Sequence, residues 1–272
     1  MILTKKQPSR GAVSIANEIS SVKGEKISAE TVRRVLHRKG YHGRKMARKP
    51  FINPLTRKLR LNFAKRYVDK DKTFWENIIF ADESAFELFV TKKDQWTWRR
   101  PNERFKAEHI VPTKKFGGGK IHIWGCMTAS GIGWMCNLPQ GLDGPTYVSI
   151  MEDELLKTAK LYFKKKNNFA ILQDRAPVHN SRVVRNWMKR NQVQLIPWPT
   201  NSPDLNPIEN LWADVKKRVA QNHINIYSRD QLWEAIQVEY ENTPRDYCKT
   251  LADSMPARLA EVIKAKGYHT KY

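Results

Sequence analysis

The segment Ile78-Ile79-Phe80-Ala81-Asp82-Glu83 is a short apolar run that ends in two acids. An uninterrupted apolar run of this length is typical of a strand that is buried on both faces of a sheet. A second run, residues 169–172, is followed by Asp174. Ligands gather at strand ends in open α/β sheets, so Asp82 and Asp174 are candidate site residues. Taken singly, each aspartate is more simply explained as a turn residue or a helix cap.

The segments around these two runs predict a sheet with flanking helices. Further strand-like pieces are expected at residues 85–90, 95–98, 121–127, 133–138 and 193–197. Helical patterns cover residues 145–165 and 181–190, and a longer helix begins at Pro207. Strands come first and then alternate with helices, which indicates an α/β domain with a mixed sheet over residues 76–272.

Residues 1–42 predict a small helix-turn-helix segment. A helical pattern at residues 12–21 is followed by a turn at 23–25 and by a second helix that begins at Ser28. In the second helix Val32, Val35 and Leu36 would face inward, which leaves a charged face suited to a DNA groove. Paired helices of this length are also common in proteins that never bind DNA.

Residues 43–75 form a basic stretch that we interpret as a linker running into a helix, interrupted by Pro50 and Pro54. Such a stretch can follow DNA phosphates, act as a nuclear-import signal or simply be solvated, and the sequence alone does not separate these roles. Together with the charged face of the preceding helix, it supplies the candidate DNA-binding residues Arg33, Arg34, His37, Arg38, Arg44, Lys45, Arg48 and Lys49.

The chain carries a formal net charge of +22, from 49 Lys and Arg against 27 Asp and Glu. Residues 1–75 alone hold 20 basic and 5 acidic residues. A charge this large and this uneven favours a polyanionic partner, with nucleic acid ahead of an anionic membrane surface.

The composition disfavours several classes of protein. The longest stretch without Asp, Glu, Lys or Arg, residues 121–142, is interrupted by polar residues and glycines, so we expect no membrane-spanning helix. Residues 1–10 lack an apolar core of signal-peptide length, so we expect an intracellular protein. The three cysteines support neither a disulfide framework nor a structural zinc site.

A third acid, Glu209, lies near the start of the helix that begins at Pro207. Asn206 is suited to cap this helix, and a Glu at the third helical position often folds back onto the amide of the cap. As a set, however, Asp82, Asp174 and Glu209 suit phosphoryl transfer on DNA, because hard cations bind carboxylate oxygens. Three such acids can hold a pair of Mg²⁺ or Mn²⁺ ions roughly 4 Å apart, which activate the nucleophile and stabilise the leaving oxygen.

Four segments follow one another in a specific order. They are residues 79–84 (IFADES), residues 117–119 (GGG) with 123–126 (IWGC), residues 172–174 (LQD) with 176–179 (APVH), and residues 197–212 (PWPTNSPDLNPIENLW). In this order they resemble successive motifs of the mariner superfamily of transposases. A gap of 34 residues separates Asp174 from Glu209, as in the Sleeping Beauty-like branch of that superfamily. The similarity covers residues 28–272.

The resemblance implies an RNase H-like catalytic domain whose catalytic and metal-binding residues are Asp82, Asp174 and Glu209. It also implies helix-turn-helix units that bind the terminal inverted repeats of a transposon in the nucleus. The expected reaction is Mg²⁺-dependent hydrolysis at the transposon ends, with Mn²⁺ as a substitute, followed by attack of the freed 3′ hydroxyls on a TA dinucleotide in target DNA. No covalent enzyme intermediate is expected. Cutting two ends in concert implies a homodimer or a larger assembly.

Two departures from the family pattern raise an alternative function. Family members normally carry two helix-turn-helix units, and this chain begins within the second. Asn usually follows the second catalytic aspartate, whereas Arg175 stands here. Its guanidinium either pairs with Asp174 and competes with metal, or turns to a DNA phosphate. The alternative function is a catalytically decayed, DNA-binding transposase remnant. A nuclease or integrase of another RNase H-like family is less consistent with the motif that contains Glu209.

A histidine and two tryptophans also fall within these motifs. We interpret His179 as a loop histidine, with contact to a phosphate or a metal as the alternative. Trp198 and Trp212 flank Glu209, and we expect them to pack the wall of the site rather than stack on bases.

Overall fold

The computed structural model describes residues 9–44, 49–88, 100–102, 119–163, 168–223 and 226–272. The chain divides into two compact units, Met1–Lys49 and Pro50–Tyr272, and each is described by itself. Several predictions lie outside the described residues: they concern Lys45, Arg48, the strand at 95–98 and the glycines at 117 and 118.

The first unit contains a pair of helices joined by a turn, as the sequence predicts. α2 (Ala12–Lys23) ends at Gly24, whose φ of 72° is a left-handed conformation that glycine adopts readily. α3 (Ala29–Arg38) begins after Ser28, whose hydroxyl accepts a hydrogen bond from the amide of Thr31 at 3.0 Å. The turn therefore begins at Gly24 and the second helix begins after Ser28, as the sequence predicts.

A small apolar core of Ile15, Ala16 and Val32 holds these two helices together, with Leu36 packed against it. Val35, which we expected to face inward, is instead 46% exposed. Val32 and Leu36 are four residues apart and share one stripe of α3, whereas Val35 lies beside that stripe. The contact between the two described helices does not cover all three side chains.

The second unit is built on a mixed sheet, which confirms the predicted fold class. In the described residues the sheet has the strand order β3-β2-β1-β4-β5. These strands are β1 (Ile78–Glu87), β2 (Lys120–Thr128), β3 (Gly131–Asn137), β4 (Ala170–Leu172) and β5 (Gln194–Leu195). β1 is antiparallel to β2 and parallel to β4, so the sheet changes from antiparallel to parallel pairing at β1.

β1 is longer than the sequence predicts, and Asp82 lies within it rather than at its end. The strand continues because β2 pairs with it from Phe80 to Glu87, with Asp82 opposite Gly125. The separate strand expected at 85–90 is therefore the second half of β1, up to Glu87. Parallel pairing with β4 stops at Phe80, opposite Leu172, so Asp82 lies just beyond it, at the end of the sheet where Asp174 follows β4.

Side chains along β1 alternate between two cores. Ile78 and Phe80 belong to a core with the C-terminal helices, whereas Ile79 and Ala81 belong to a core with the helices on the opposite face. By the two-residue period of a strand, Asp82 continues the first series and the next residue, Glu83, continues the second. Two adjacent acids are thus directed to opposite faces of the sheet.

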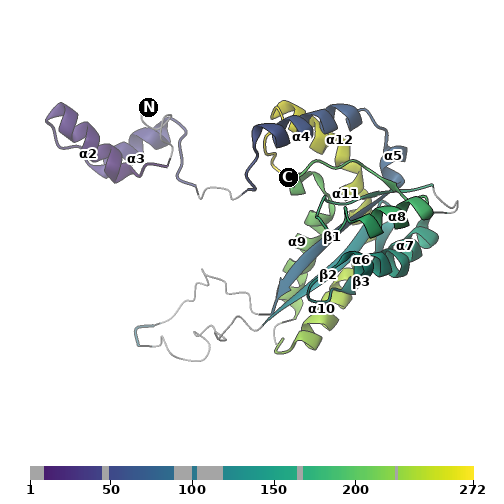
Figure 1. Cartoon of the computed structure of the whole chain (residues 1–272). Coiled ribbons are helices and arrows are strands. Elements are labelled where there is room, and N and C mark those ends of the chain that lie inside the picture. Colours follow the sequence, from purple (N-terminus) through teal and green to yellow (C-terminus); the bar gives the residue numbers. More distant parts are fainter. Residues whose placement is uncertain (1–8, 45–48, 89–99, 103–118, 164–167, 224–225) are drawn as a thin grey trace. The chain divides into compact units, whose positions relative to one another are not determined.

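Helices cover both faces (Figure 1). One face carries α6 (Gly144–Ile150), a π-helical turn (Met151–Leu155), α7 (Leu156–Tyr162) and α8 (Arg182–Arg190). The continuous helix expected at 145–165 is thus interrupted by the π-helical turn. The other face carries α9 (Ile208–Asn222), α10 (Arg229–Glu241) and α11 (Arg245–Asp253).

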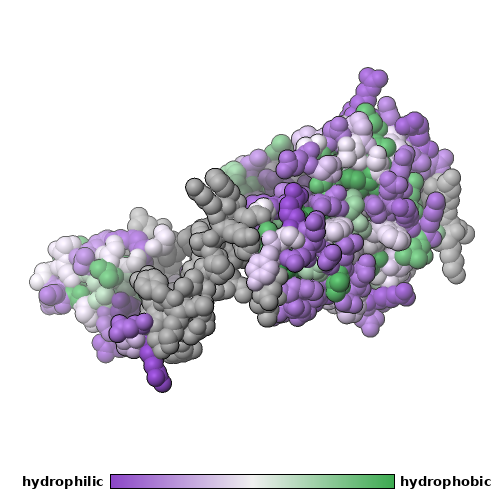
Figure 2. All heavy atoms as spheres, turned by 90° about the horizontal axis from the view of Figure 1, so that it is seen from below, coloured by the Kyte–Doolittle hydropathy of each residue, from purple (hydrophilic) through white to green (hydrophobic). Residues whose placement is uncertain are grey.

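The helix expected within the basic stretch is α4 (Pro54–Tyr67), and it packs against α12 (Met255–Lys264) within the second unit. α5 (Lys72–Glu76) then leads into β1. Among the described helices none has the length and apolar character needed to span a membrane. The visible surface of the second unit is largely hydrophilic, with apolar residues scattered between polar ones (Figure 2). Cys126, Cys136 and Cys248 are all free thiols.

Candidate active site

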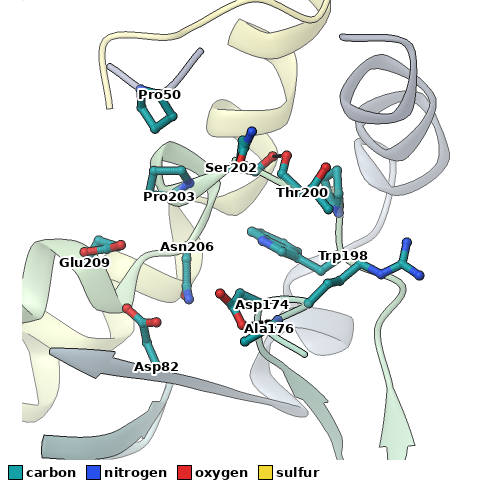
Figure 3. A pocket seen from close by; sticks show the side chains of 13 residues that line it. Pro50, Asp82, Asp174, Ala176, Trp198, Thr200, Ser202, Pro203, Asn206 and Glu209 are labelled. Atoms are coloured by element: carbon teal, nitrogen blue, oxygen red, sulfur yellow. Dashed lines mark hydrogen bonds between the residues drawn. The ribbon is translucent and has the colours of Figure 1, made fainter. Parts of the chain in front are cut away.

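The three predicted acids meet in one cavity of about 320 Å³ (Figure 3). Asp82 comes from β1, Asp174 from the loop after β4, and Glu209 from the first turn of α9. The remaining wall is largely formed by the loop 198–203, together with Asn206. The cavity thus combines the end of the parallel strands with the start of a helix that lies far away in the sequence.

Asp82 is the most crowded of the three acids. Burial raises the pKa of Asp82 well above its ordinary value, and the nearby carboxylates of Glu209, Glu83 and Asp174 raise it further. Burial and like charges both disfavour the ionised form. A carboxylate in such surroundings is stabilised by a cation, and strongly shifted carboxyl groups in a cleft are characteristic of functional sites.

Glu209 faces the cavity and does not form the predicted capping box. Among the described residues, no side chain caps α9, and Pro207 takes the capping position that we expected for Asn206. The backbone carbonyl of Asn206 accepts a hydrogen bond from the amide of Glu209 at 3.2 Å. Burial raises the pKa of Glu209; Lys216 opposes this shift and Asp174 adds to it. Asn206 fails as a cap because its side chain is directed to Ala81 on β1.

Asp174 is held by His179, which is 3% exposed. The imidazole Nδ1 lies 2.8 Å from Asp174 Oδ1, and Nε2 lies 2.9 Å from Glu83 Oε1. The amide of Ala176 donates a further hydrogen bond to Asp174 Oδ1 at 2.9 Å. The ring of His179 also stacks on Tyr147 with centroids 4.3 Å apart. His179 therefore lies in the turn before α8, as the sequence predicts, and there it is a buried link between two acids.

The protonation state of His179 depends on its two carboxylate partners. Burial lowers the pKa of His179, but hydrogen bonds to Asp174 and Glu83 outweigh it and raise the pKa to about 10. The hydrogen bond from His179 in turn lowers the pKa of Asp174, against the effect of burial. At neutral pH a protonated imidazole thus donates one hydrogen bond to Asp174 and one to Glu83.

Two groups of side chains bear on metal binding. Among the described residues, the atoms of Glu83, Asp174 and His179 lie within 4.8 Å of one another, and the oxygens of the three predicted acids are spaced more widely. Both ring nitrogens of His179 are hydrogen-bonded to carboxylates, so the compact group is a hydrogen-bonded relay in this structure. The wider carboxylate set lines the cavity and offers the oxygen atoms that hard cations bind.

Arg175 lines the cavity but does not pair with Asp174, because no ion pair within 4.0 Å joins these two described residues. Asp174 Oδ1 is already bonded to His179 and Ala176. We expected the guanidinium of Arg175 either to pair with Asp174 and compete with metal, or to turn to a DNA phosphate. The structure does not show the pairing with Asp174, and Arg175 is exposed.

The predicted DNA-binding side chains that the structure describes are exposed. Arg33, Arg34, His37 and Arg38 lie on or at the end of α3, and Arg44 follows it. Lys49 is exposed as well. Their contact with DNA stays a prediction.

Two residues of the site, Glu83 and Asn206, were not predicted as site residues from the sequence. Glu83 could have been identified from the sequence, because adjacent acids on a strand face opposite sides of the sheet. The acid that faces away from the cavity then needs a partner on the other face. Asn206 was instead expected to cap the following helix, because Asn before Pro is a common pattern at a helix start. Trp198 is buried and lines the cavity, as expected, whereas Trp212 is buried in the core against Phe86 and Tyr240 and does not line the cavity.

Comparisons with known proteins agree with this architecture. A family model described as "Transposase" matches residues 1–69, and a model described as "DDE superfamily endonuclease" matches residues 77–232. The chain is 35% identical to the Tc1 transposase of Caenorhabditis elegans, over 98% of this chain and 97% of that one. It is 33% identical to the Tcb1 transposase of Caenorhabditis briggsae, with the same coverage.

Solved structures share the fold. A pre-cleavage Mos1 transpososome matches 99% of this chain and 78% of its own, with a TM-score of 0.81 and 18% identity. A Mos1 strand transfer complex matches 99% of this chain and 77% of its own, with a TM-score of 0.77 and 18% identity. The family matches and the shared fold together show that the chain belongs to the Tc1/mariner family of transposases, with a DDE endonuclease domain.

Proposed function

We propose that this transposase cleaves transposon ends at their terminal inverted repeats and joins the freed 3′ hydroxyls to TA target DNA. The observation that carries the proposal is the meeting of Asp82, Asp174 and Glu209 in one cavity. We assign the catalytic and metal-binding roles to these three acids. Their different origins in the chain support the assignment, since local turn or capping chemistry does not explain why all three face one space.

The residues of the cavity fit divalent cations. All three acids offer carboxylate oxygens, the ligands that Mg²⁺ and Mn²⁺ prefer. Burial and the neighbouring carboxylates raise the pKa of Asp82, and added positive charge would offset the repulsion between these carboxylates. Divalent cations at this site would activate the attacking water or 3′ hydroxyl and stabilise the leaving oxygen. Solved Mos1 paired-end complexes with Mn and with Mg support the same choice of ion for this chain.

Other side chains of the site have supporting roles in this proposal. His179 and Glu83 orient Asp174 through the hydrogen bonds described above. Arg175 lies at the cavity, where its guanidinium is suited to a DNA phosphate. α3 presents Arg33, Arg34 and Arg38 to the transposon end.

The assembly and the location are also part of the proposal. Structures of paired-end Mos1 complexes support a homodimer or larger synaptic complex for this chain. A nuclear location follows from the proposed chromosomal DNA substrate. The alternative of a catalytically decayed remnant relied in part on Arg175 competing for Asp174, and the two side chains are not paired.

A cleavage assay tests the proposed function. The full chain is incubated with a labelled duplex that carries the terminal repeat of its own element, with Mg²⁺, with Mn²⁺ or with EDTA. We expect strand cleavage at the element end with either ion and none with EDTA. A duplex with a scrambled repeat is the control. Binding to the repeat without cleavage in either ion would support the remnant instead.

Substitutions of His179 test whether it orients Asp174. The amide nitrogen of Asn can take the place of Nδ1, so His179→Asn is expected to keep the hydrogen bond to Asp174. The amide of Gln reaches the position of Nε2 and keeps only the bond to Glu83. We therefore expect His179→Gln to lower the cleavage rate by about 10- to 100-fold, and His179→Asn to lose less. Equal loss in single-turnover assays of the two variants would contradict an orienting role.

A further inference from the structure

Asn206 has an unusual position in the cavity. It is 4% exposed, and its side chain lies between Glu209 and Asp174 and close to Asp82 (Figure 3). Its amide nitrogen donates a long hydrogen bond, 3.4 Å, to the carbonyl of Ala81. Its amide oxygen Oδ1 is buried and has no hydrogen-bond partner among the described residues.

The orientation of this amide follows from its neighbour. A backbone carbonyl only accepts hydrogen bonds, so the group of Asn206 that faces the carbonyl of Ala81 is the NH₂. The oxygen is then the atom turned away from β1. Ala81 immediately precedes Asp82, and the backbone carbonyl of Asn206 holds the amide of Glu209 at 3.2 Å. Asn206 is thus tied to the backbone beside Asp82 and to the backbone of Glu209.

The local backbone explains why this side chain is available. A 3₁₀ turn at Pro203–Leu205 leaves Asn206 extended, with φ −88° and ψ 111°. Pro207 then takes the capping position of α9 and has no amide hydrogen of its own. The side chain is directed across to β1 instead of to its own helix. A buried amide oxygen without a partner costs free energy, so its presence in a polar cavity points to a ligand.

The charge of the site limits what that ligand is. An amide oxygen accepts hydrogen bonds or binds cations, and an ionised DNA phosphate offers neither a hydrogen nor positive charge. The cavity is already lined by three acids, whose negative charges would repel a further carboxylate. A neutral oxygen adds a ligand for a hard cation without adding repulsion, and Asn carbonyls are common ligands of such ions.

We propose that Asn206 Oδ1 is an additional, neutral oxygen ligand for the divalent cations that Asp82, Asp174 and Glu209 hold. The inference rests on the proposed function, because it assumes that the three acids form a metal site. It assigns to Asn206 a role in metal affinity that is separate from the role of the carboxylates and from helix capping.

Mn²⁺ binding to the full chain without DNA tests this role, with free Mn²⁺ measured by electron paramagnetic resonance. Asn206→Ala is expected to weaken Mn²⁺ binding by about 10-fold. Asn206→Asp restores an oxygen and is expected to bind at least as tightly as the unchanged chain. Asn191→Ala, which removes a partly buried amide at the end of α8, is the matched control and should leave the affinity unchanged.

Thermal unfolding separates a metal ligand from a structural residue. Without metal, Asn206→Ala should unfold at the same temperature as the unchanged chain or higher, because an unpaired buried oxygen is removed. With Mn²⁺, its melting temperature should rise less. An affinity within twofold of the unchanged chain, in a preparation where Asp82→Asn loses binding, would overturn the role of Asn206 alone. Failure of the unchanged chain to bind Mn²⁺ would overturn both this inference and the proposed metal site.

Discussion

Asp174→Asn is expected to lower the rate of transposon-end cleavage by about 1,000-fold or more, because a carboxylate ligand of a two-metal site contributes several kcal/mol to the transition state. The substitution keeps the volume of the side chain and an oxygen that can accept from the amide of Ala176. The fold should therefore persist while the charge that holds the cation is lost. Single-turnover cleavage of a labelled transposon end in Mg²⁺ measures the effect.

The other two acids should behave alike. Asp82→Asn and Glu209→Gln are each expected to give a loss of similar size, since all three side chains line the same cavity. Asp230→Asn is the matched control, because Asp230 is an exposed acid in the first turn of α10 and does not line the cavity. Cleavage within tenfold of the unchanged chain in any of the three variants would remove that acid from the catalytic set.

Asp82→Asn should also change how stability depends on pH. The pKa of Asp82 is raised in the folded chain, so the folded state binds a proton more tightly than the unfolded state does. The metal-free protein therefore loses stability as pH rises from about 4, the ordinary value, through the raised pKa. Asn does not ionise and removes this loss. The variant should thus be inactive and at least as stable as the unchanged chain at neutral pH, as urea unfolding without metal would show.

Arg60→Ala is expected to destabilise the second unit by about 3–5 kcal/mol, because it leaves a buried carboxylate without its partner. The side chain of Arg60 is fully buried and donates two hydrogen bonds to Asp204, at 2.8 and 2.7 Å. Its Nε also donates to the carbonyl of Gly267 at 3.1 Å, and the hydroxyl of Thr270 donates to Asp204 at 2.9 Å. α4, the loop before α9 and the C-terminal residues are joined at this one ion pair.

Urea unfolding compares this variant with one at an exposed ion pair. Lys72 lies 3.5 Å from Asp253 and its side chain is 72% exposed, so Lys72→Ala should cost at most about 1 kcal/mol. Asp204 belongs to the turn that leads to Asn206 and Glu209. We therefore expect Arg60→Ala to lower cleavage as well, by displacing that turn. A loss of stability no larger than that of Lys72→Ala would show that the buried pair does not hold the unit together.

The Arg60–Asp204 pair also predicts a sensitivity to acid. Burial alone would raise the pKa of Asp204, but the hydrogen bonds and charge of Arg60, together with Thr270, lower it below its ordinary value. The stabilisation from the pair is complete above the ordinary pKa of about 4 and is lost as pH falls through the lower folded value. Arg60→Ala should abolish this part of the acid dependence.

Much of the architecture could be predicted because it depends on neighbours in the chain. The apolar run before Asp82 predicts a central strand whatever its partners are, and the glycine and serine signals predict the turn and second helix of the first unit. The acids were found through motif order and spacing, which preserve chemistry across a family. The length of β1 could not be predicted, because its second half exists only through pairing with β2.

The three acids and the fold class could thus be predicted from the sequence, because apolar runs and metal-ligating residue types act through their own chemistry. The partners of those acids became visible only in three dimensions. His179 meets Glu83 across 96 positions, Asn206 meets Ala81 across 125, and Arg60 meets Asp204 across 144. Contacts of this kind leave no local pattern, because chain folding rather than adjacency brings the groups within hydrogen-bonding distance.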